Sequence, residues 1–367
     1  MASVWKSKIV CIFLLFYLFT FLPLTAYAQA APKVGLVLSG GGAKGAAEVG
    51  VLKVLEEQGI HVDCIAGTSI GAIVGALYSA GYKADELEKM FREQDWIPLL
   101  TDYREDLWST PYKKVGSTHY VFGFPVYDEG NKGMGVLRAN QIEQYIRDML
   151  KAKKVETFKQ LKTPFYCVAT DLSKAEEVVF KEGDLTKAVR ASMAIPAIFK
   201  TVDVDGRTLV DGGAVNNLPV DVLINNEHPD FIICIDLTQK EPTKDESVSE
   251  TVRNIASYIQ FLAQFVGLGN ITEWLINQPQ VERYYANKAL LRADIDLYIN
   301  PRLGNYSYSS FSKENISEML RMGEESARDI TVTKRLWKIA ALQKAAKENA
   351  SDSMFHDILN LGKSLIR

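Results

Sequence analysis

The stretch that decides the fold is Val62-Asp63-Cys64-Ile65-Ala66-Gly67-Thr68-Ser69-Ile70-Gly71. Its first half is apolar and has the length of a buried strand, and a helical apolar pattern follows to Tyr78 and stops at Gly81. Glycines two residues before and after Ser69 permit a tight strand-to-helix turn, because neighbouring backbone can approach without meeting a Cβ atom. The pattern therefore predicts a nucleophile elbow that exposes the Ser69 hydroxyl at a helix N-terminus.

A structural interpretation of the same serine stands beside the catalytic one. A buried serine that caps a helix is also surrounded by small residues. In a chain with 25 glycines, the Gly-x-Ser-x-Gly pattern alone is only moderately specific. The context favours a nucleophile, because backbone amides and the helix dipole at that position stabilise developing negative charge.

A second strand-to-helix junction lies upstream. Residues 34–38 predict a buried strand, and Ser39-Gly40-Gly41-Gly42-Ala43-Lys44-Gly45 leads into a helix that ends near Gln58 at Gly59. Consecutive glycines leave several N–H groups unshielded, which predicts a cradle for an oxyanion or a phosphate. The glycine spacing also satisfies the dinucleotide fingerprint, but the second strand lacks the terminal acidic residue that would bind a ribose.

The order strand, helix, strand, helix predicts parallel pairing. Three further runs predict buried strands, at residues 165–169, 208–210 and 231–237. We therefore expect an α/β fold with an open, mostly parallel central sheet and helices on both faces.

Three other stretches differ from this pattern in composition or periodicity. Residues 96–136 are rich in aromatic residues, glycines and charges, and predict a flap or insertion. Residues 248–274 place apolar side chains near helical spacing, which fits either a core-facing helix or a lipid-contacting lid helix. Residues 335–350 predict a solvated helix, and we assign residues 328–367 to a C-terminal helical tail.

The first residues have the pattern of a secretory signal. Two lysines precede an apolar run over residues 9–22, and Ala26-Tyr27-Ala28 fits the small-x-small cleavage rule. We expect a signal peptide at residues 1–28 and a mature chain that begins near Gln29, although cleavage after Ala30 also fits. Retention as an anchor is the alternative, but the run is shorter than the about 20 residues that a membrane span needs. The protein is expected to be exported, and so periplasmic or secreted.

Charge and cysteine content exclude some partners and bonds. The net charge is -3 and no run of Lys or Arg is dense, so we expect no nucleic-acid partner. Outside the signal segment, Cys64, Cys167 and Cys234 lie in apolar runs, where a free cysteine behaves as a small hydrophobe. We expect no disulfide and no metal, and the sequence leaves the oligomeric state open.

A serine nucleophile needs a base, and the histidines are poorly placed. His61 starts the strand that ends at Ser69, so at about 3.3 Å per residue it lies about 26 Å away. His228 precedes a strand, whereas sites in open α/β sheets lie beyond the C-terminal ends of strands. His356 is in the tail, which leaves His119 in the aromatic stretch as the histidine that could reach the site.

Asp211 is the candidate carboxylate. It ends the strand-like run at residues 208–210 and is followed by Gly212-Gly213, so it is either a base at a strand end or part of a turn. Six residues earlier, Asp205-Gly206 predicts a hairpin turn. An unperturbed aspartate has a pKa of about 3.9, so an Asp211 base would need burial to raise its pKa.

Together these segments resemble the patatin-like phospholipase family, whose motifs are G-G-G-x-[KR]-G, G-x-S-x-G and D-G-[GA] in that order. The block at residues 191–199 is similar to the family's A-S-x-x-x-P-x-x-F, and the likeness covers about residues 33–327. The matching residues are Gly40-Gly41-Gly42-Ala43-Lys44-Gly45, Gly67-Thr68-Ser69-Ile70-Gly71 and Asp211-Gly212-Gly213.

The resemblance implies a three-layer α/β/α fold and a Ser-Asp dyad, with Ser69 as nucleophile and Asp211 as proton acceptor. It implies hydrolysis of fatty acyl esters of a lipid or phospholipid at a membrane surface, without a cofactor or metal. The oxyanion hole and the elbow would be formed by Gly40, Gly41, Gly42, Lys44, Gly45, Gly67 and Gly71.

Some points stay open. Lys44 could attract a lipid phosphate, pin the glycine loop or be a surface residue. Glu48 stands where exported relatives often have histidine, outside the motifs. Acyl transfer through the same acyl-enzyme, and non-catalytic lipid binding, are the alternative functions. Head group, chain length and the ester position cleaved depend on the shape of the substrate pocket, which motifs do not define.

Overall fold

The computed structural model describes residues 31–107, 109–121, 124–128, 137–196, 198–238, 295–304 and 306–365. The predicted signal peptide, residues 1–28, and the predicted apolar helix at residues 248–274 lie outside the described residues. Lys33–Ala340 form one compact unit, which extends beyond the predicted domain at residues 33–327. In the portion of the chain that is described, none of the helices combines the length and the apolar character required to cross a bilayer.

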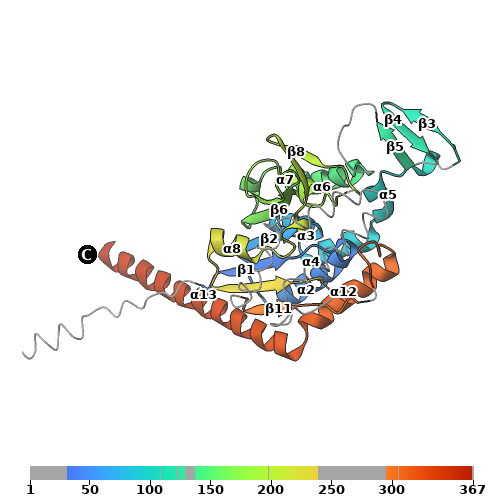
Figure 1. Cartoon of the computed structure of the whole chain (residues 1–367). Helices are drawn as coiled ribbons and strands as arrows, with labels where there is room; N and C mark the ends of the chain where they lie inside the picture. Colours follow the sequence, from blue (N-terminus) through green and yellow to red (C-terminus); the bar gives the residue numbers. More distant parts are fainter. Residues whose placement is uncertain are drawn as a thin grey trace, which may run out of the picture. The chain divides into compact units, whose positions relative to one another are not determined.

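A mixed sheet is the centre of this unit (Figure 1). Five neighbouring strands are parallel. β7 and β9 pair antiparallel with β6, and β8 pairs antiparallel with β9. The order is β11 (Leu297–Ile299), β10 (Phe231–Ile235), β1 (Val34–Leu38), β2 (Cys64–Thr68), β6 (Phe165–Asp171), β9 (Arg207–Asp211) and β8 (Val202–Val204), and β7 (Glu176–Phe180) also pairs with β6.

Strand β6 brings two other strands end to end. β2 pairs with residues 165–168 of β6, and β9 pairs antiparallel with residues 169–171. β7 pairs with residues 167–171, overlapping both, so β2 and β9 share the opposite edge of β6. The C-terminal ends of β2 and β9 therefore point at each other, which brings the end of β9 to the strand-to-helix turn after β2.

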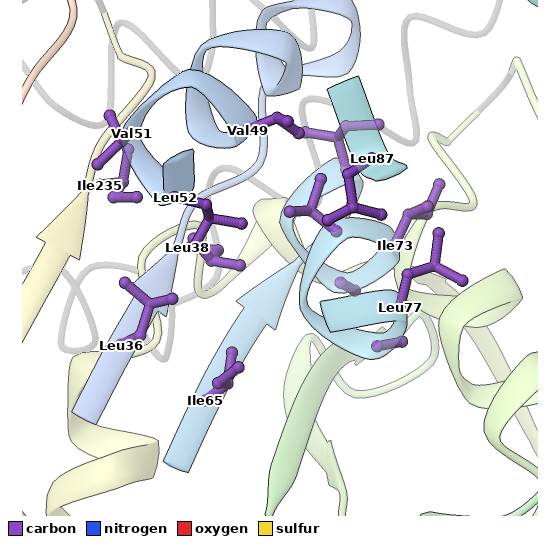
Figure 2. Close-up of a cluster of buried hydrophobic side chains, with 14 of the residues drawn as sticks. Leu36, Leu38, Val49, Val51, Leu52, Ile65, Ile73, Leu77, Leu87 and Ile235 are labelled. Atoms are coloured by element: carbon purple, nitrogen blue, oxygen red, sulfur yellow. The ribbon is translucent and has the colours of Figure 1, made fainter. Parts of the chain in front are cut away.

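Helices cover both faces of the sheet. On one face, α2 (Gly45–Glu57), α3 (Ile70–Ser79) and α4 (Ala84–Glu93) pack on the sheet side chains that Figure 2 shows. On the other face, α8 (Val220–Glu227) packs on a second cluster that includes Val37 and Ala66. Successive strand residues thus alternate between two cores, and the predicted three-layer α/β/α fold is confirmed.

The described part of the chain contains further helices. They are α5 (Trp96–Thr101), α6 (Asn140–Ala152), α7 (Leu185–Ser192), α12 (Lys313–Ala327) and α13 (Ile330–Leu365), with 3-10 turns η1 (Gly42–Lys44), η2 (Glu105–Leu107), η3 (Phe158–Gln160) and η4 (Gly212–Ala214). A helix over the predicted residues 335–350 is confirmed as part of α13. Its first turns are not a solvated tail, because Leu336 and Ile339 are buried in the main core.

The aromatic stretch at residues 96–136 differs in part from a flap. Trp96 is buried, and its indole N–H donates to the Phe91 carbonyl at 3.1 Å, so the stretch begins in the core. Beyond it, β3 (Lys113–Val115), β4 (Thr118–Val121) and β5 (Phe124–Asp128) form a separate antiparallel sheet.

Two smaller predictions concern turns and cysteines. The hairpin between β8 and β9 is confirmed, since Asp205 and Gly206 both have positive φ and β8 pairs antiparallel with β9. Cys64, Cys167 and Cys234 are buried in the sheet cores, as expected for small apolar side chains.

Candidate active site

Ser69 lies at a sharp turn between β2 and α3, as predicted. Its φ of 57 and ψ of -118 are unusual for a residue with a side chain. A Cβ atom on Gly67 would lie 2.3 Å from the Gly71 carbonyl oxygen, and one on Gly71 would lie 2.6 Å from the Leu38 carbonyl oxygen. Both elbow positions therefore require glycine, and the close backbone approach holds Ser69 in its strained conformation.

The Ser69 hydroxyl donates to Asp211 Oδ2 at 2.6 Å. The other carboxylate oxygen of Asp211, Oδ1, accepts the Gly213 N–H at 2.7 Å. The Asp211 backbone N–H donates to the Ala194 carbonyl at 2.8 Å, and its carbonyl accepts the Thr170 hydroxyl at 2.9 Å. Both Ser69 and Asp211 are buried, so the pair is held in one geometry from several sides.

Burial changes the basicity of Asp211. Desolvation raises the pKa of its carboxyl to about 6, although the hydrogen bonds from Ser69 and Gly213 favour the charged form. A carboxylate with this pKa is largely ionised at neutral pH and accepts a proton more readily than an ordinary aspartate.

Ser192 supports the elbow from the block at residues 191–199. Its hydroxyl donates to the Val168 carbonyl at 2.6 Å and accepts the Ser69 backbone N–H at 3.0 Å. The block at residues 191–199 was recognisable in the sequence, but the role of Ser192 was not predictable, because its contact with Ser69 joins residues 123 positions apart.

Asn217 holds the start of the glycine loop. Its carbonyl accepts the Gly40 N–H at 3.1 Å, and its side-chain amide donates to the Gly40 carbonyl at 3.2 Å. A Cβ atom on Gly40 would lie 3.1 Å from the Ser69 Cβ atom, so the loop runs directly beside the nucleophile candidate. The role of Asn217, six residues after Asp211, was not predicted, because its contact with Gly40 joins residues 177 positions apart.

The predicted oxyanion-hole residues are together in this loop, but their amides differ. Gly40 donates to Asn217, Lys44 donates to the Gly41 carbonyl at 3.2 Å, and Gly45 donates within the turn. The Gly41 and Gly42 N–H groups have no hydrogen-bond partner in the described part of the chain. These two amides are therefore the donors that the loop leaves for a bound anion.

Lys44 and Glu48 lie one helical turn apart at the start of α2, and both are buried. Burial lowers the pKa of the Lys44 ammonium and raises the pKa of the Glu48 carboxyl well above its usual value. Only 2% of Lys44 is exposed, so the interpretation of Lys44 as a surface residue is wrong.

The histidines do not provide the partner of the Ser69 hydroxyl, which is Asp211. His61 is exposed beside Asp63, His228 ends α8, and His119 contacts the Tyr112 hydroxyl in the small sheet. His356 lies on α13, and its side chain is outside the described part of the structure.

The site consists of a strained serine that is hydrogen-bonded to a buried aspartate. It lies beside a glycine loop on a three-layer α/β/α fold. A family model described as patatin-like phospholipase matches residues 36–224, which include the loop, Ser69 and Asp211. The chain belongs to the patatin-like phospholipase family.

Several curated proteins are similar to this chain. An uncharacterized NTE family protein of Mycobacterium bovis is 34% identical over 225 residues, covering 61% of this chain and 54% of that protein. Patatin-like phospholipase domain-containing protein 6 of Homo sapiens is 32% identical over 212 residues, covering 57% of this chain and 14% of that protein. A lysophospholipase of Mycosarcoma maydis is 34% identical over 194 residues, covering 52% and 9%. The chain thus spans about half, or much less, of the length of these relatives.

Among solved structures, VipD from Legionella pneumophila matches 83% of this chain and 67% of its own chain, with a TM-score of 0.45 and 14% sequence identity.

Proposed function

We propose that this protein is a serine lipid acyl hydrolase, a phospholipase A or esterase, that works through a Ser69-Asp211 dyad. The observation that supports it best is the 2.6 Å hydrogen bond from the Ser69 hydroxyl to Asp211 Oδ2 at a strained elbow. Backbone strain of this kind persists where the surrounding structure holds it, and it concentrates at active sites.

The proposed reaction has two half-reactions. Ser69 Oγ attacks the ester carbonyl carbon while Asp211 Oδ2 takes the hydroxyl proton, which gives a tetrahedral oxyanion. The carbonyl re-forms, the bond to the alcohol oxygen breaks, and Asp211 returns the proton to that oxygen. Water then attacks the acyl-Ser69 ester and passes a proton to Asp211, and the fatty acid leaves as Ser69 regains its proton.

The oxyanion would be stabilised by the Gly41 and Gly42 amides. They lie in the loop that runs beside Ser69 and have no hydrogen-bond partner among the described residues. Donors that are already oriented need little reorganisation when negative charge develops, so their contribution falls on the transition state.

The lipid substrate rests on the family. Its model is described as patatin-like phospholipase, and one relative is named a lysophospholipase. Acyl transfer to an alcohol other than water would use the same acyl-enzyme, and would appear as a new ester product. The backbone strain at Ser69 argues against a protein that only binds lipid, because binding does not require that strain.

The experiment uses vesicles of phosphatidylcholine, and separately lysophosphatidylcholine micelles, with free fatty acid measured by mass spectrometry. We expect fatty acid release by the wild-type protein and none above background by Ser69→Ala. Release by neither protein from either lipid would contradict the proposed function.

We further propose that the protein is an exported form of the family, cleaved after Ala28 and acting at a membrane surface. The lysines, apolar run and small residues of the first 28 positions support it. Expression of the full chain with N-terminal sequencing tests this, with Gln29 expected as the first residue of the protein recovered outside the cytoplasm. An intact Met1 in cytoplasmic protein would refute it.

A further inference from the structure

The glycine loop is held by a segment that the family match does not reach. The match ends at residue 224, whereas Tyr308 lies between β11 and α12. We propose that Tyr308 is a positioning residue that clamps the glycine loop through its backbone carbonyl and its ring, and thereby keeps the Gly41 and Gly42 amides in place. This inference rests on the proposed function and deepens it.

The first contact of the clamp is made by the Tyr308 carbonyl. It accepts the Ala43 N–H at 2.9 Å, so this amide is not available to a substrate. The same oxygen lies 2.4 Å from where a Cβ atom on Gly42 would be, and Gly42 has a φ of +57. Tyr308 therefore packs on the loop at the point where the loop needs glycine, next to one of the two free amides.

The second contact is made by the Tyr308 ring. The Lys44 ammonium lies over this ring, with Nζ 5.0 Å from the ring centroid. Lys44 is buried, and it forms no ion pair with a carboxylate in the part of the chain that the structure describes. A desolvated ammonium without a carboxylate partner depends strongly on an aromatic face, because cation–π attraction grows as water is excluded.

The two contacts are made to neighbouring residues. The Tyr308 carbonyl accepts a hydrogen bond from Ala43, and the Tyr308 ring contacts the Lys44 ammonium. Tyr308 itself is 37% exposed, so it covers the loop from the surface of the protein.

The segment that carries Tyr308 is itself fixed to the main unit. The Phe311 ring stacks on the buried Trp96 ring at a centroid distance of 5.8 Å. On the other side, the Asn300 side chain donates to the Asp236 carbonyl at 2.8 Å. Tyr308 is held between these two attachments, so it can impose a position on the loop.

Positioning and substrate binding make different kinetic predictions. Amides that stabilise an oxyanion act when charge develops, so their displacement lowers kcat and leaves KM nearly unchanged. A Tyr308 that only bound lipid in the ground state would change KM and leave kcat unchanged.

A double-mutant cycle tests the clamp, with kcat and KM measured on p-nitrophenyl octanoate for wild type, Tyr308→Phe, Tyr308→Ala, Lys44→Met and the Lys44→Met/Tyr308→Ala double variant. We expect Tyr308→Ala to lower kcat about tenfold, and Tyr308→Phe to stay within about twofold of wild type because it keeps the ring face. In the Lys44→Met background, Tyr308→Ala should cost less than about twofold, because the ring has lost its cation.

A readout that does not depend on activity separates the clamp from the proposed function. The Lys44 Cε protons, observed by NMR, should carry an upfield ring-current shift in wild type and Tyr308→Phe that Tyr308→Ala removes. If this shift behaves as expected while the wild type cleaves no ester, the proposed function fails and the loop contact stands.

Three results would overturn the clamp. They are an equal kcat loss from Tyr308→Ala with and without Lys44, a change in KM alone, and a Lys44 resonance that does not respond to Tyr308→Ala.

Discussion

Burial determines what Asp211 can do. In the folded protein its carboxyl has a pKa of about 6, against an ordinary value of 3.8, and desolvation is the main cause. The folded state therefore binds a proton at Asp211 more tightly than the unfolded chain does. Ionisation of this group costs stability as the pH rises between these two pKa values, and the full cost, about 3 kcal/mol, applies above pH 6.

The first prediction concerns Asp211→Asn, which removes the charge and keeps the shape. Relative to wild type, the free energy of unfolding of this variant should rise by about 1–3 kcal/mol between pH 4.5 and pH 7.5, because only the wild type must ionise a buried carboxyl. Urea unfolding at the two pH values measures the difference.

The same titration should govern activity. Wild-type kcat should fall below about pH 6, where Asp211 becomes protonated and can no longer accept the Ser69 proton.

The stability prediction has its own contradicting outcome. If the difference in free energy of unfolding between Asp211→Asn and wild type does not vary with pH, the Asp211 carboxyl titrates at its ordinary value.

The residues of the site differ in whether a short sequence pattern indicates their role. Ser69 and Asp211 were predictable, because a strained elbow and a strand-end aspartate each leave a pattern within a few positions of sequence. Ser192, Asn217 and Tyr308 were not predicted, because they act through hydrogen bonds or ring contacts to residues more than 100 positions away. A backbone carbonyl such as that of Tyr308 leaves no residue signal, since every residue has one.

At the scale of elements, the approach of β9 to β2 was only partly predictable. Its strand and the hairpin before it follow from the run of residues 202–211 with Asp205-Gly206 at the turn. Its antiparallel pairing with the end of β6 is a tertiary choice, made where β2 stops and leaves that edge open. Parallel pairing was predicted correctly for β1, β2, β6 and β10, whereas β9 is antiparallel and β11 was not predicted.

Helices α2 and α12 pack closely through two glycines. A Cβ atom on Gly323 of α12 would lie 2.1 Å from the Ala47 carbonyl oxygen, and one on Gly50 of α2 would lie 2.1 Å from the Leu320 carbonyl oxygen. Because the obstructing atoms belong to helix backbones, neither helix can yield without moving as a whole.

A further prediction is that Gly323→Ala destabilises the protein by about 1–3 kcal/mol, although alanine has the better helix propensity. The matched control is Gly304→Ala, because among the described residues, its chain neighbours aside, no atom lies within 4 Å of its Cβ position. Its effect should stay within about 0.5 kcal/mol. Thermal unfolding measures both variants, and equal melting temperatures would refute the tight packing of α12 on α2.

At the scale of the whole molecule, the family match and the compact unit have different ends. The match covers residues 36–224, whereas the compact unit runs from Lys33 to Ala340 and includes β11, α12 and Tyr308. Motifs therefore place the Ser-Asp pair, and the later part of the unit completes its surroundings.

The central claim is that Ser69 attacks an acyl ester with Asp211 as its base. The most direct test is kcat for hydrolysis of p-nitrophenyl octanoate by the wild-type protein, Ser69→Ala and Asp211→Asn at pH 7.5. We predict measurable turnover by wild type and a loss of at least about 10³-fold in each variant, because both residues act in the same step. Turnover that survives in Ser69→Ala, or that Asp211→Asn leaves at the wild-type rate, would contradict the account.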